Sequence, residues 1–182
     1  IGALPDFAKW IVFIVSIVFL YKQKVKLMSA ERFEMQKVDL SYFETAPYLF
    51  RSTVTIRCTP QQLFAGFEDA DSWPAWAMPI TNVEWTSPKP FGVGTTRSVT
   101  MLGNLIGHEE FLLWKPFTEM AFRFNQVNKD KALVSFGEHY QVTDLGNGEV
   151  KLVWTVGMEP AGPGAFSMKI SKPMVVWELQ LT

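Results

Sequence analysis

The order of apolar and polar positions divides the chain into three segments, and the first is almost wholly apolar. Residues 10–21 read WIVFIVSIVFLY, a run without charge in which Ser16 is the one small polar residue. Twelve helical residues span about 18 Å, whereas the hydrocarbon core of a bilayer is about 30 Å thick. A helix that begins near residue 1 supplies the missing length. We therefore predict a transmembrane helix over residues 1–24.

Two alternatives for this first segment stay open. One is a buried helix of a globular protein, and the other is a cleaved signal peptide, which needs positive charge before the apolar run and small residues after it. Here Lys22, Lys24 and Lys26 follow the run. By the positive-inside rule, these lysines predict a single-pass membrane protein whose globular domain is cytoplasmic.

The second segment, residues 25–47, mixes charged and apolar positions with only loose helical spacing. A simple juxtamembrane connector and an amphipathic helix lying on the bilayer both fit this pattern. The pair Ala46-Pro47 ends the segment, because the residue before a proline avoids helical geometry.

From residue 48 onward the pattern changes to that of a sheet. Residues 48–58 alternate and are rich in β-branched side chains, which predicts a strand. Thr59-Pro60 is typical of a helix start and predicts a short helix over residues 61–68. A second short helix begins at Asp71-Ser72 and runs through Met78. Further strands are predicted over residues 82–86, 95–102, 105–114, 119–127, 132–143 and 149–158.

Residues 166–182 return to helical spacing and form the only long element available to cover one face of this meander. The predicted class is α+β. The predicted architecture is a helix-grip fold, a curved antiparallel sheet around a long C-terminal helix, with two short helices after the first strand. One transmembrane helix precedes it.

Composition narrows the range of functions. Hydrophobic residues make up 48% of the 182 residues and aromatic residues 14%, which suits a wide core or an apolar cavity. The net charge of −1 argues against a nucleic-acid partner, because such a partner needs a basic face. The single cysteine, Cys58, excludes an internal disulfide and a multi-cysteine zinc site.

Several short motifs in a fixed order resemble those of one superfamily. They are Thr59-Pro60 leading into Leu63-Phe64, Ser72-Trp73-Pro74-Ala75-Trp76, Pro90-Phe91-Gly92-Val93-Gly94-Thr95, Glu109 followed by Trp114-Lys115-Pro116, and Gly146-Asn147-Gly148. The sequence is similar to the polyketide cyclase/dehydrase and lipid-transport group of the SRPBCC superfamily, which includes START domains and birch-pollen allergens. The resemblance covers about residues 50–182 and implies a START-like domain over residues 48–182. The N-terminal apolar segment departs from it, and the short final helix suggests a cropped end.

The resemblance implies a hydrophobic cavity between the sheet and the C-terminal helix. By alternation along the strands, one face of each strand points toward it. The ligand-binding candidates are Trp76, Met78, Glu109, Phe111, Leu113, Phe122, Phe124, Phe136, Glu138, Tyr140, Trp154, Phe166 and Met174.

Glu109 and Glu138 are unusual because they are acids on otherwise apolar faces. A buried, unpaired carboxylate costs several kcal/mol, so each acid needs a partner, a proton or a place at the rim. Arg97 and Arg123 lie on neighbouring strands and are the candidate partners. In the functional interpretation the acids fix the polar group of a ligand. The alternative, slightly favoured, is a register that is off by one residue, which places both acids on the solvent face.

The two histidines, His108 and His139, fall on separate strands and are interpreted as surface residues. We predict no metal site, no cofactor and no catalytic residue. The favoured function is a membrane-anchored binding module for a lipid, quinone-like or polyketide-like molecule, with the lipid bilayer and that molecule as partners. The alternatives are an accessory subunit of a larger membrane protein complex and a cyclase- or hydrolase-type enzyme that uses the same cavity.

Overall fold

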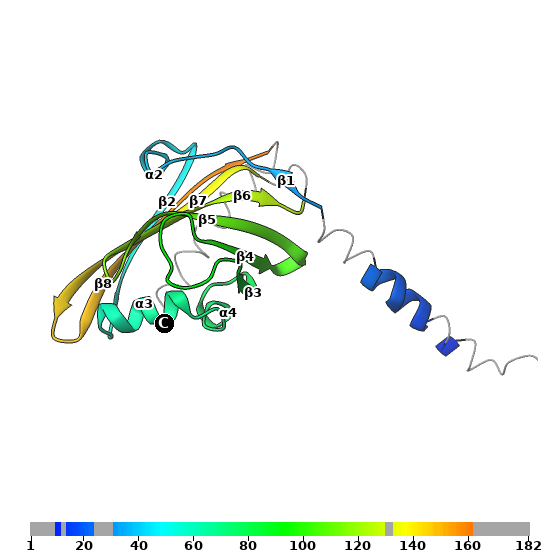
Figure 1. Cartoon of the computed structure of the whole chain (residues 1–182), viewed down its shortest axis with the longest axis horizontal. Helices are drawn as coiled ribbons and strands as arrows, with labels where there is room; N and C mark the ends of the chain where they lie inside the picture. The colour runs from blue at the N-terminus through cyan, green and yellow to red at the C-terminus, as the bar shows by residue number, and fades with distance from the viewer. Residues whose placement is uncertain (1–9, 12–13, 24–30, 130–132, 162–182) are drawn as a thin grey trace, which may run out of the picture.

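The structure is a computed structural model that describes residues 10–11, 14–23, 31–129 and 133–161. An antiparallel sheet arches over two short helices, with strands in the order β2-β8-β7-β6-β5-β4-β3 and β1 paired with β6 beside this path (Figure 1). The strands are β1 Phe33–Glu34, β2 Tyr48–Ile56, β3 Ile80–Trp85, β4 Thr96–Met101, β5 Leu105–Lys115, β6 Glu119–Val127, β7 Leu133–Gly146 and β8 Glu149–Pro160. The predicted curved antiparallel sheet is confirmed.

The two short helices after β2 are also present, as α3 (Pro60–Glu68) and α4 (Trp73–Trp76). Thr59 caps α3, because its hydroxyl accepts from the Gln62 amide at 3.2 Å while the Gln62 side chain accepts from the Thr59 amide at 2.8 Å. The second helix ends at Trp76, two residues before the predicted Met78.

Two indole groups fasten the C-terminal end of α3 to its surroundings. Trp73 Nε1 donates to the Phe67 carbonyl and Trp85 Nε1 donates to the Glu68 carbonyl, both at 3.0 Å. The last carbonyls of a helix have no partner within the helix, so these two bonds satisfy groups that otherwise need water. They also fix α3 against α4 and β3.

Strands β6 and β7 are paired over only part of their length, and residues 33–36 lie between them beyond that part. They pair only between Glu119–Arg123 and Gly137–Gln141. Beyond Arg123, β1 pairs with β6, and the Gln36 amide donates to the Val134 carbonyl at 2.9 Å. A segment from before the predicted domain is therefore part of the sheet.

Residues 35–46 then cross the outer face of the sheet, on the side opposite α3 and α4 (Figure 1). They contain the four-residue helix α2 (Tyr42–Thr45). The Tyr42 hydroxyl shares a 2.7 Å hydrogen bond with Ser135, and the Phe43 ring packs against His139 in a tilted arrangement. The described part of the predicted connector thus packs on the domain through a strand and one helical turn, rather than as a long amphipathic helix.

The glycines beneath this segment explain how closely it approaches the sheet. A Cβ at Gly157 would lie 2.8 Å from the Tyr42 ring, and a Cβ at Gly137 would lie 2.9 Å from the Phe122 carbonyl and 3.2 Å from the Phe43 ring. Only glycine leaves room for both aromatic rings at these two positions.

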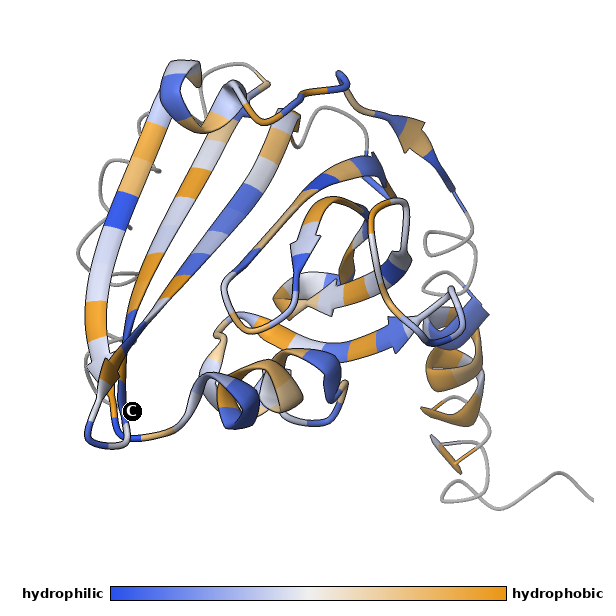
Figure 2. Cartoon of the chain, turned by 60° about the vertical axis from the view of Figure 1, so that its left-hand side comes forward, coloured by the Kyte–Doolittle hydropathy of each residue, from blue (hydrophilic) through white to orange (hydrophobic). Residues whose placement is uncertain are grey.

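The hydrophobic core lies on the inner face, between the sheet and α3 and α4. Hydrophobic and hydrophilic residues alternate along the long strands, as Figure 2 shows, so one face of each strand enters this core. The turn between β7 and β8 has positive φ at Gly146, Asn147 and Gly148, which is why the predicted hairpin forms there.

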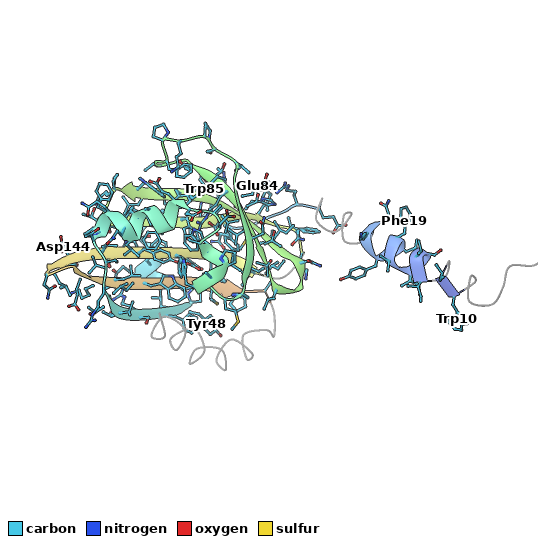
Figure 3. All side chains as sticks on the ribbon, turned by 90° about the horizontal axis from the view of Figure 1, so that it is seen from below. Trp10, Phe19, Tyr48, Glu84, Trp85 and Asp144 are labelled. Carbon is cyan, nitrogen blue, oxygen red and sulfur yellow. The ribbon has the colours of Figure 1, made fainter. Side chains whose placement is uncertain are left out.

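The predicted terminal elements fall largely outside the described residues. Residues 10–11 and 14–23 are helical, and their large apolar side chains are exposed, as Trp10 and Phe19 show in Figure 3. Among the described residues no helix is both long enough and apolar enough to cross a membrane. The C-terminal helix predicted over residues 166–182, with Phe166 and Met174, lies outside the described residues.

Candidate functional site: a polar cluster on the inner face

A row of side chains crosses four strands on the inner face of the sheet. Trp85 pairs with Arg97, Arg97 with Glu109, and Glu109 with Phe124 in the register of β3, β4, β5 and β6. Residues that are directly opposite in neighbouring strands lie about 5 Å apart, so this register alone places Arg97 beside Glu109.

Arg97 and Glu109 form an ion pair inside the core. The Arg97 Nε donates to the Glu109 carboxylate, and the two side chains are 0% and 3% exposed. Burial raises the pKa of Glu109 to about 7, although the charge and hydrogen bond of Arg97 act in the opposite direction. The loss of solvent therefore outweighs the attraction to Arg97.

Four aromatic rings surround the Arg97 guanidinium. Its central carbon lies 4.0 Å from the centre of the Trp73 ring, 4.8 Å from that of Phe122, 5.2 Å from that of Trp85 and 5.3 Å from that of Phe111. A cation over an aromatic face gains about 0.5–1 kcal/mol at an exposed site and about 2 kcal/mol or more when it is desolvated. The rings thus offset part of the cost of burying this charge.

The guanidinium keeps unused hydrogen-bond capacity. Its Nη1 and Nη2 atoms are buried and have no hydrogen-bond partner among the described residues. A buried donor without an acceptor costs about 1–3 kcal/mol, and more when it is charged. Acceptors from elsewhere, such as water or a ligand, therefore suit this site.

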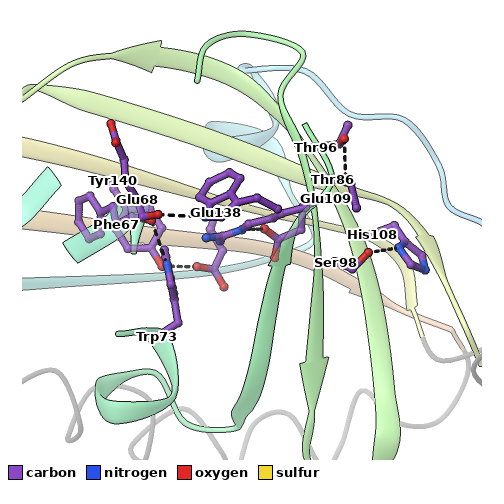
Figure 4. A network of polar contacts seen from close by, with 12 residues as sticks. Phe67, Glu68, Trp73, Thr86, Thr96, Ser98, His108, Glu109, Glu138 and Tyr140 are labelled. Carbon is purple, nitrogen blue, oxygen red and sulfur yellow. Dashed lines mark hydrogen bonds and ion pairs between the residues drawn. The ribbon is translucent and has the colours of Figure 1, made fainter. Parts of the chain in front are cut away.

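Glu138 forms a second part of the cluster, on β7. Its Oε2 atom accepts hydrogen bonds from the Tyr140 hydroxyl and from Trp154 Nε1, the latter at 3.0 Å. Burial raises the pKa of Glu138, although both hydrogen bonds and the charge of Arg97 act to lower it. Burial and the neighbouring Glu138 also raise the pKa of Tyr140 well above its usual value, so this hydroxyl keeps its proton and donates. Figure 4 shows Glu109, Glu138 and Tyr140 together on the inner side of the sheet.

The inner face is not sealed around Glu138. Glu138 itself is half-buried, and Phe136 and Trp154, which point to the same side, are only partly buried against the core. By contrast Glu109, Phe111, Phe122, Phe124 and Tyr140 are almost completely buried. The cluster therefore runs from a closed end at Arg97 and Glu109 to an accessible end at Glu138.

The structure decides between the two sequence-based interpretations of the acids. Glu109 is 3% exposed and paired with Arg97, so the alternative in which both acids face solvent is wrong. Arg97 is a partner as predicted, but Arg123 is not a partner of Glu109 or Glu138. It points to the outer face, where it binds Glu110 at 2.8 Å and the Val38 carbonyl at 2.7 Å.

Two other candidates lie away from the cluster. Met78 is 52% exposed. Leu113 lies outside the core cluster, because a β-bulge between Phe111 and Leu113 shifts the alternation of β5. Trp114 takes the inward position instead and packs on Phe111, with ring centres 4.9 Å apart. Trp76 is partly buried in the cluster, beside Trp73.

Sequence reasoning missed the aromatic residues around the guanidinium. Trp73 and Trp85 were not candidates, although Trp85 occupies the strand position opposite Arg97. The available signal was the strand register itself. Among the described residues no group of three or more His, Cys, Asp or Glu side chains is placed to hold a metal ion.

Known proteins resemble this chain in both sequence and fold. The family model described as "Polyketide cyclase / dehydrase and lipid transport" matches residues 49–181. Uncharacterized proteins of Mycobacterium bovis and Mycobacterium tuberculosis are each 48% identical over 140 residues, which is 77% of this chain and 83% of theirs.

Solved structures agree at the level of the fold. A START superfamily protein from Mycobacterium smegmatis superposes with a TM-score of 0.53 at 12% identity, covering 74% of this chain and 99% of that one. A protein from Thermus thermophilus gives a TM-score of 0.58 at 15% identity, covering 72% and 91%. At these identities the likeness concerns the fold alone.

Proposed function

Since the chain belongs to the polyketide cyclase / dehydrase and lipid transport family, we propose that it binds an apolar small molecule on the inner face of its sheet. The family and the fold suggest a hydrophobic ligand, and a lipid, a quinone-like or a polyketide-like molecule fits this description. The ligand contacts the aromatic residues of the inner face and directs a hydrogen-bonding group toward the polar cluster.

The observation that carries the proposal is the position of Glu138. It is a half-buried carboxylate among aromatic side chains, and both of its hydrogen bonds within the described residues go to Oε2. A carboxylate has two oxygens and about four acceptor sites, so Oε1 remains available to a donor group of a ligand. Tyr140 and Trp154 hold the carboxylate in one orientation, which reduces the entropy lost on binding.

Ligand retention tests this proposal. We expect that organic-solvent extraction of the full chain, purified in mild detergent, releases a stoichiometric apolar compound that mass spectrometry detects. Glu138→Gln keeps the shape of the side chain but removes the charge, and it should lower the amount retained severalfold. Glu84→Gln is the matched control, because Glu84 is an exposed residue of β3. A protein that is repeatedly empty, or two variants that retain equal amounts, contradicts the proposal.

One observation favours a second candidate function, proton transfer to or from the bound molecule. Glu138 has a raised pKa and is hydrogen-bonded to Tyr140 inside an apolar site, an arrangement that general acid–base catalysis uses. Incubation of the loaded protein in deuterated water tests it. Deuterium incorporation into the ligand that disappears in Glu138→Gln supports catalysis, and an unchanged ligand mass supports a binding module.

We also propose that the N-terminal segment attaches the domain to a membrane. The uncharged run of residues 10–21 supports this, because large side chains such as Trp10, Phe19 and Leu20 are 58–66% exposed. The lysines after the run favour a cytoplasmic domain. In flotation assays the full chain should move with lipid vesicles, and a Phe19→Glu/Leu20→Glu variant should stay behind. If a second protein co-purifies with the chain after mild solubilisation, this result instead supports the alternative that the chain is an accessory subunit of a larger membrane protein complex.

A further inference from the structure

A polar hollow of about 380 Å³ lies on the face of the sheet opposite the aromatic core. The residues of its floor alternate with the inward-pointing Arg97 and Glu109, so their side chains project to the outer face. The lining consists of Arg32, Glu34, Lys37, Thr86, Thr96, Arg97, Ser98, His108, Glu109, Asn125 and Gln126. Every residue of this lining carries a polar or charged group.

The charged side chains of the lining, apart from the buried Arg97–Glu109 pair, are predominantly positive. Arg97 and Glu109 neutralise each other within the core. That leaves the exposed Arg32 and Lys37 against the carboxylate of Glu34, which accepts a hydrogen bond from Gln126 at 2.5 Å. A second carboxylate, Glu110, borders the hollow through Asn125; Lys37 helps to lower its pKa, but its ion pair is with Arg123 at 2.8 Å. Within the described part of the chain, neither Arg32 nor Lys37 has a carboxylate within ion-pair distance.

His108 provides a neutral polar group on the opposite wall. Its Nδ1 lies 2.8 Å from the Ser98 hydroxyl. Burial, helped by the charge of Arg32, lowers the pKa of His108 to about 4, so the ring is neutral at physiological pH. If Ser98 donates to Nδ1, the ring proton sits on Nε2, and this buried atom has no hydrogen-bond partner in the described residues. An unpaired buried polar atom is unfavourable, which points to a missing partner.

We propose that this hollow binds an oxyanion of the phosphate class between Arg32 and Lys37 on one side and His108, held by Ser98, on the other. A phosphate group has several acceptor oxygens and so can meet two cations and one neutral donor at once. The same chemistry is offered by the head group of an anionic phospholipid and by a soluble phosphate ester. Arg97 and Glu109 also line the hollow, but the residues proposed to contact the anion lie outside the inner-face cluster, and the proposal does not depend on the inner-face ligand.

The position of the site gives it a structural consequence. Arg32 and Lys37 belong to the segment around β1, which follows the N-terminal apolar residues, whereas Ser98 and His108 belong to β4 and β5. A bound oxyanion therefore joins this segment to the body of the sheet.

Imidazole NMR of the full chain in neutral detergent tests the proposal, with sodium pyrophosphate as the soluble probe. The chain has only two histidines, and His139, which is bonded to Glu119 at 2.8 Å outside the hollow, serves as the internal control. We expect saturable shifts of the His108 ring signals and none for His139. Arg32→Gln/Lys37→Gln should weaken binding about tenfold or more, since each charged contact contributes strongly.

A matched double variant separates a specific site from a general effect of charge. Arg57→Gln/Lys151→Gln removes the same formal charge from residues outside the lining and should leave pyrophosphate affinity almost unchanged. The proposal is overturned if both double variants lose affinity for pyrophosphate equally. It is also overturned if the native chain binds neither pyrophosphate nor anionic lipid vesicles. Thermal unfolding of each variant verifies that it is folded.

Vesicles identify the source of the anion. We compare binding to vesicles of phosphatidylcholine with and without phosphatidylglycerol, because the N-terminal apolar segment contributes equally to both. A preference for phosphatidylglycerol that is lost in Arg32→Gln/Lys37→Gln, but kept in the control, supports a lipid head group. Pyrophosphate binding without such a preference supports a soluble phosphate ester. No preference together with no pyrophosphate binding overturns the proposal.

Discussion

The ion pair between Arg97 and Glu109 makes an unusual prediction about stability. A variant that removes one partner of a buried ion pair typically loses 3–5 kcal/mol. Here, however, burial raises the pKa of Glu109 from 4.5 to about 7 in spite of Arg97. The protonated and ionised carboxyls are therefore about equally populated in the folded protein at pH 7, and Glu109→Gln is a close mimic of the protonated form. We expect Glu109→Gln to be at least as stable as the native protein at pH 7.

The magnitude follows from the pKa difference. Between pH 4.5 and pH 7 the folded state binds more protons at Glu109 than the unfolded state does, so this group lowers stability as the pH rises. One pKa unit corresponds to 1.36 kcal/mol, and the loss therefore reaches about 3 kcal/mol near pH 7. Relative to the native protein, Glu109→Gln should be about equally stable at pH 4.5 and up to about 3 kcal/mol more stable at pH 7.

Denaturant unfolding of both proteins at several pH values measures this difference. Glu138 contributes with the same sign as Glu109, and His108, whose folded pKa is lowered, contributes with the opposite sign between about pH 4 and 6.5. Both groups are present in both proteins, so subtracting the two curves leaves Glu109 together with its coupling to Glu138, whose charge helps to raise the pKa of Glu109. The exposed Glu84→Gln serves as control and should change stability by less than about 0.5 kcal/mol. If Glu109→Gln is several kcal/mol less stable than the native protein at pH 7, attraction to Arg97 outweighs burial and the reasoning is wrong.

Three further predictions concern the surroundings of the site. Arg97→Met removes the charge that holds down the pKa of Glu109, so Glu109 should stay protonated to higher pH and denaturant unfolding should show a stability loss that grows as the pH rises above about 7. Folding lowers the pKa of His108 from 6.5 to about 4, so the native protein should gain stability as the pH rises through this range. His108→Asn lacks this group, and thermal unfolding of both proteins from pH 4 to 6.5 should show the gain in the native protein alone. Gly157→Ala places a Cβ 2.8 Å from the Tyr42 ring and should cost about 1–3 kcal/mol, with faster proteolysis of residues 35–46; an unchanged cleavage rate would show that this segment is not held by that contact.

The regular part of the fold could be predicted because its signals are local. Strand alternation, the Thr59 cap and the glycine turn between β7 and β8 each depend on a few neighbouring residues. The outer-face segment could not be predicted in the same way. Its contacts join residues far apart in sequence, such as Tyr42 and Ser135, which are separated by 93 positions. Its own sequence has no clear period, so nothing local indicates where it packs.

The polar cluster was predictable only in part. Alternation indicated that Glu109 and Glu138 share faces with apolar residues, and Arg97 was a candidate partner. The β-bulge between Phe111 and Leu113 was not visible, and it exchanges Leu113 for Trp114 in the core. A bulge adds one residue to a strand without a distinctive sequence, so a strict period of two fails beyond it.

The energetics of the cluster support a role in recognition rather than in stability. Replacing a buried ion pair with apolar side chains of similar volume is often neutral or stabilising. At this site the raised pKa of Glu109 and the unpaired Nη atoms of Arg97 both indicate unfavourable terms. An aromatic core around α3 and α4 does not need such a pair in order to form. If Glu109→Gln proves more stable than the native protein and yet retains less ligand, the charges serve the bound molecule, and the free protein is less stable because of them.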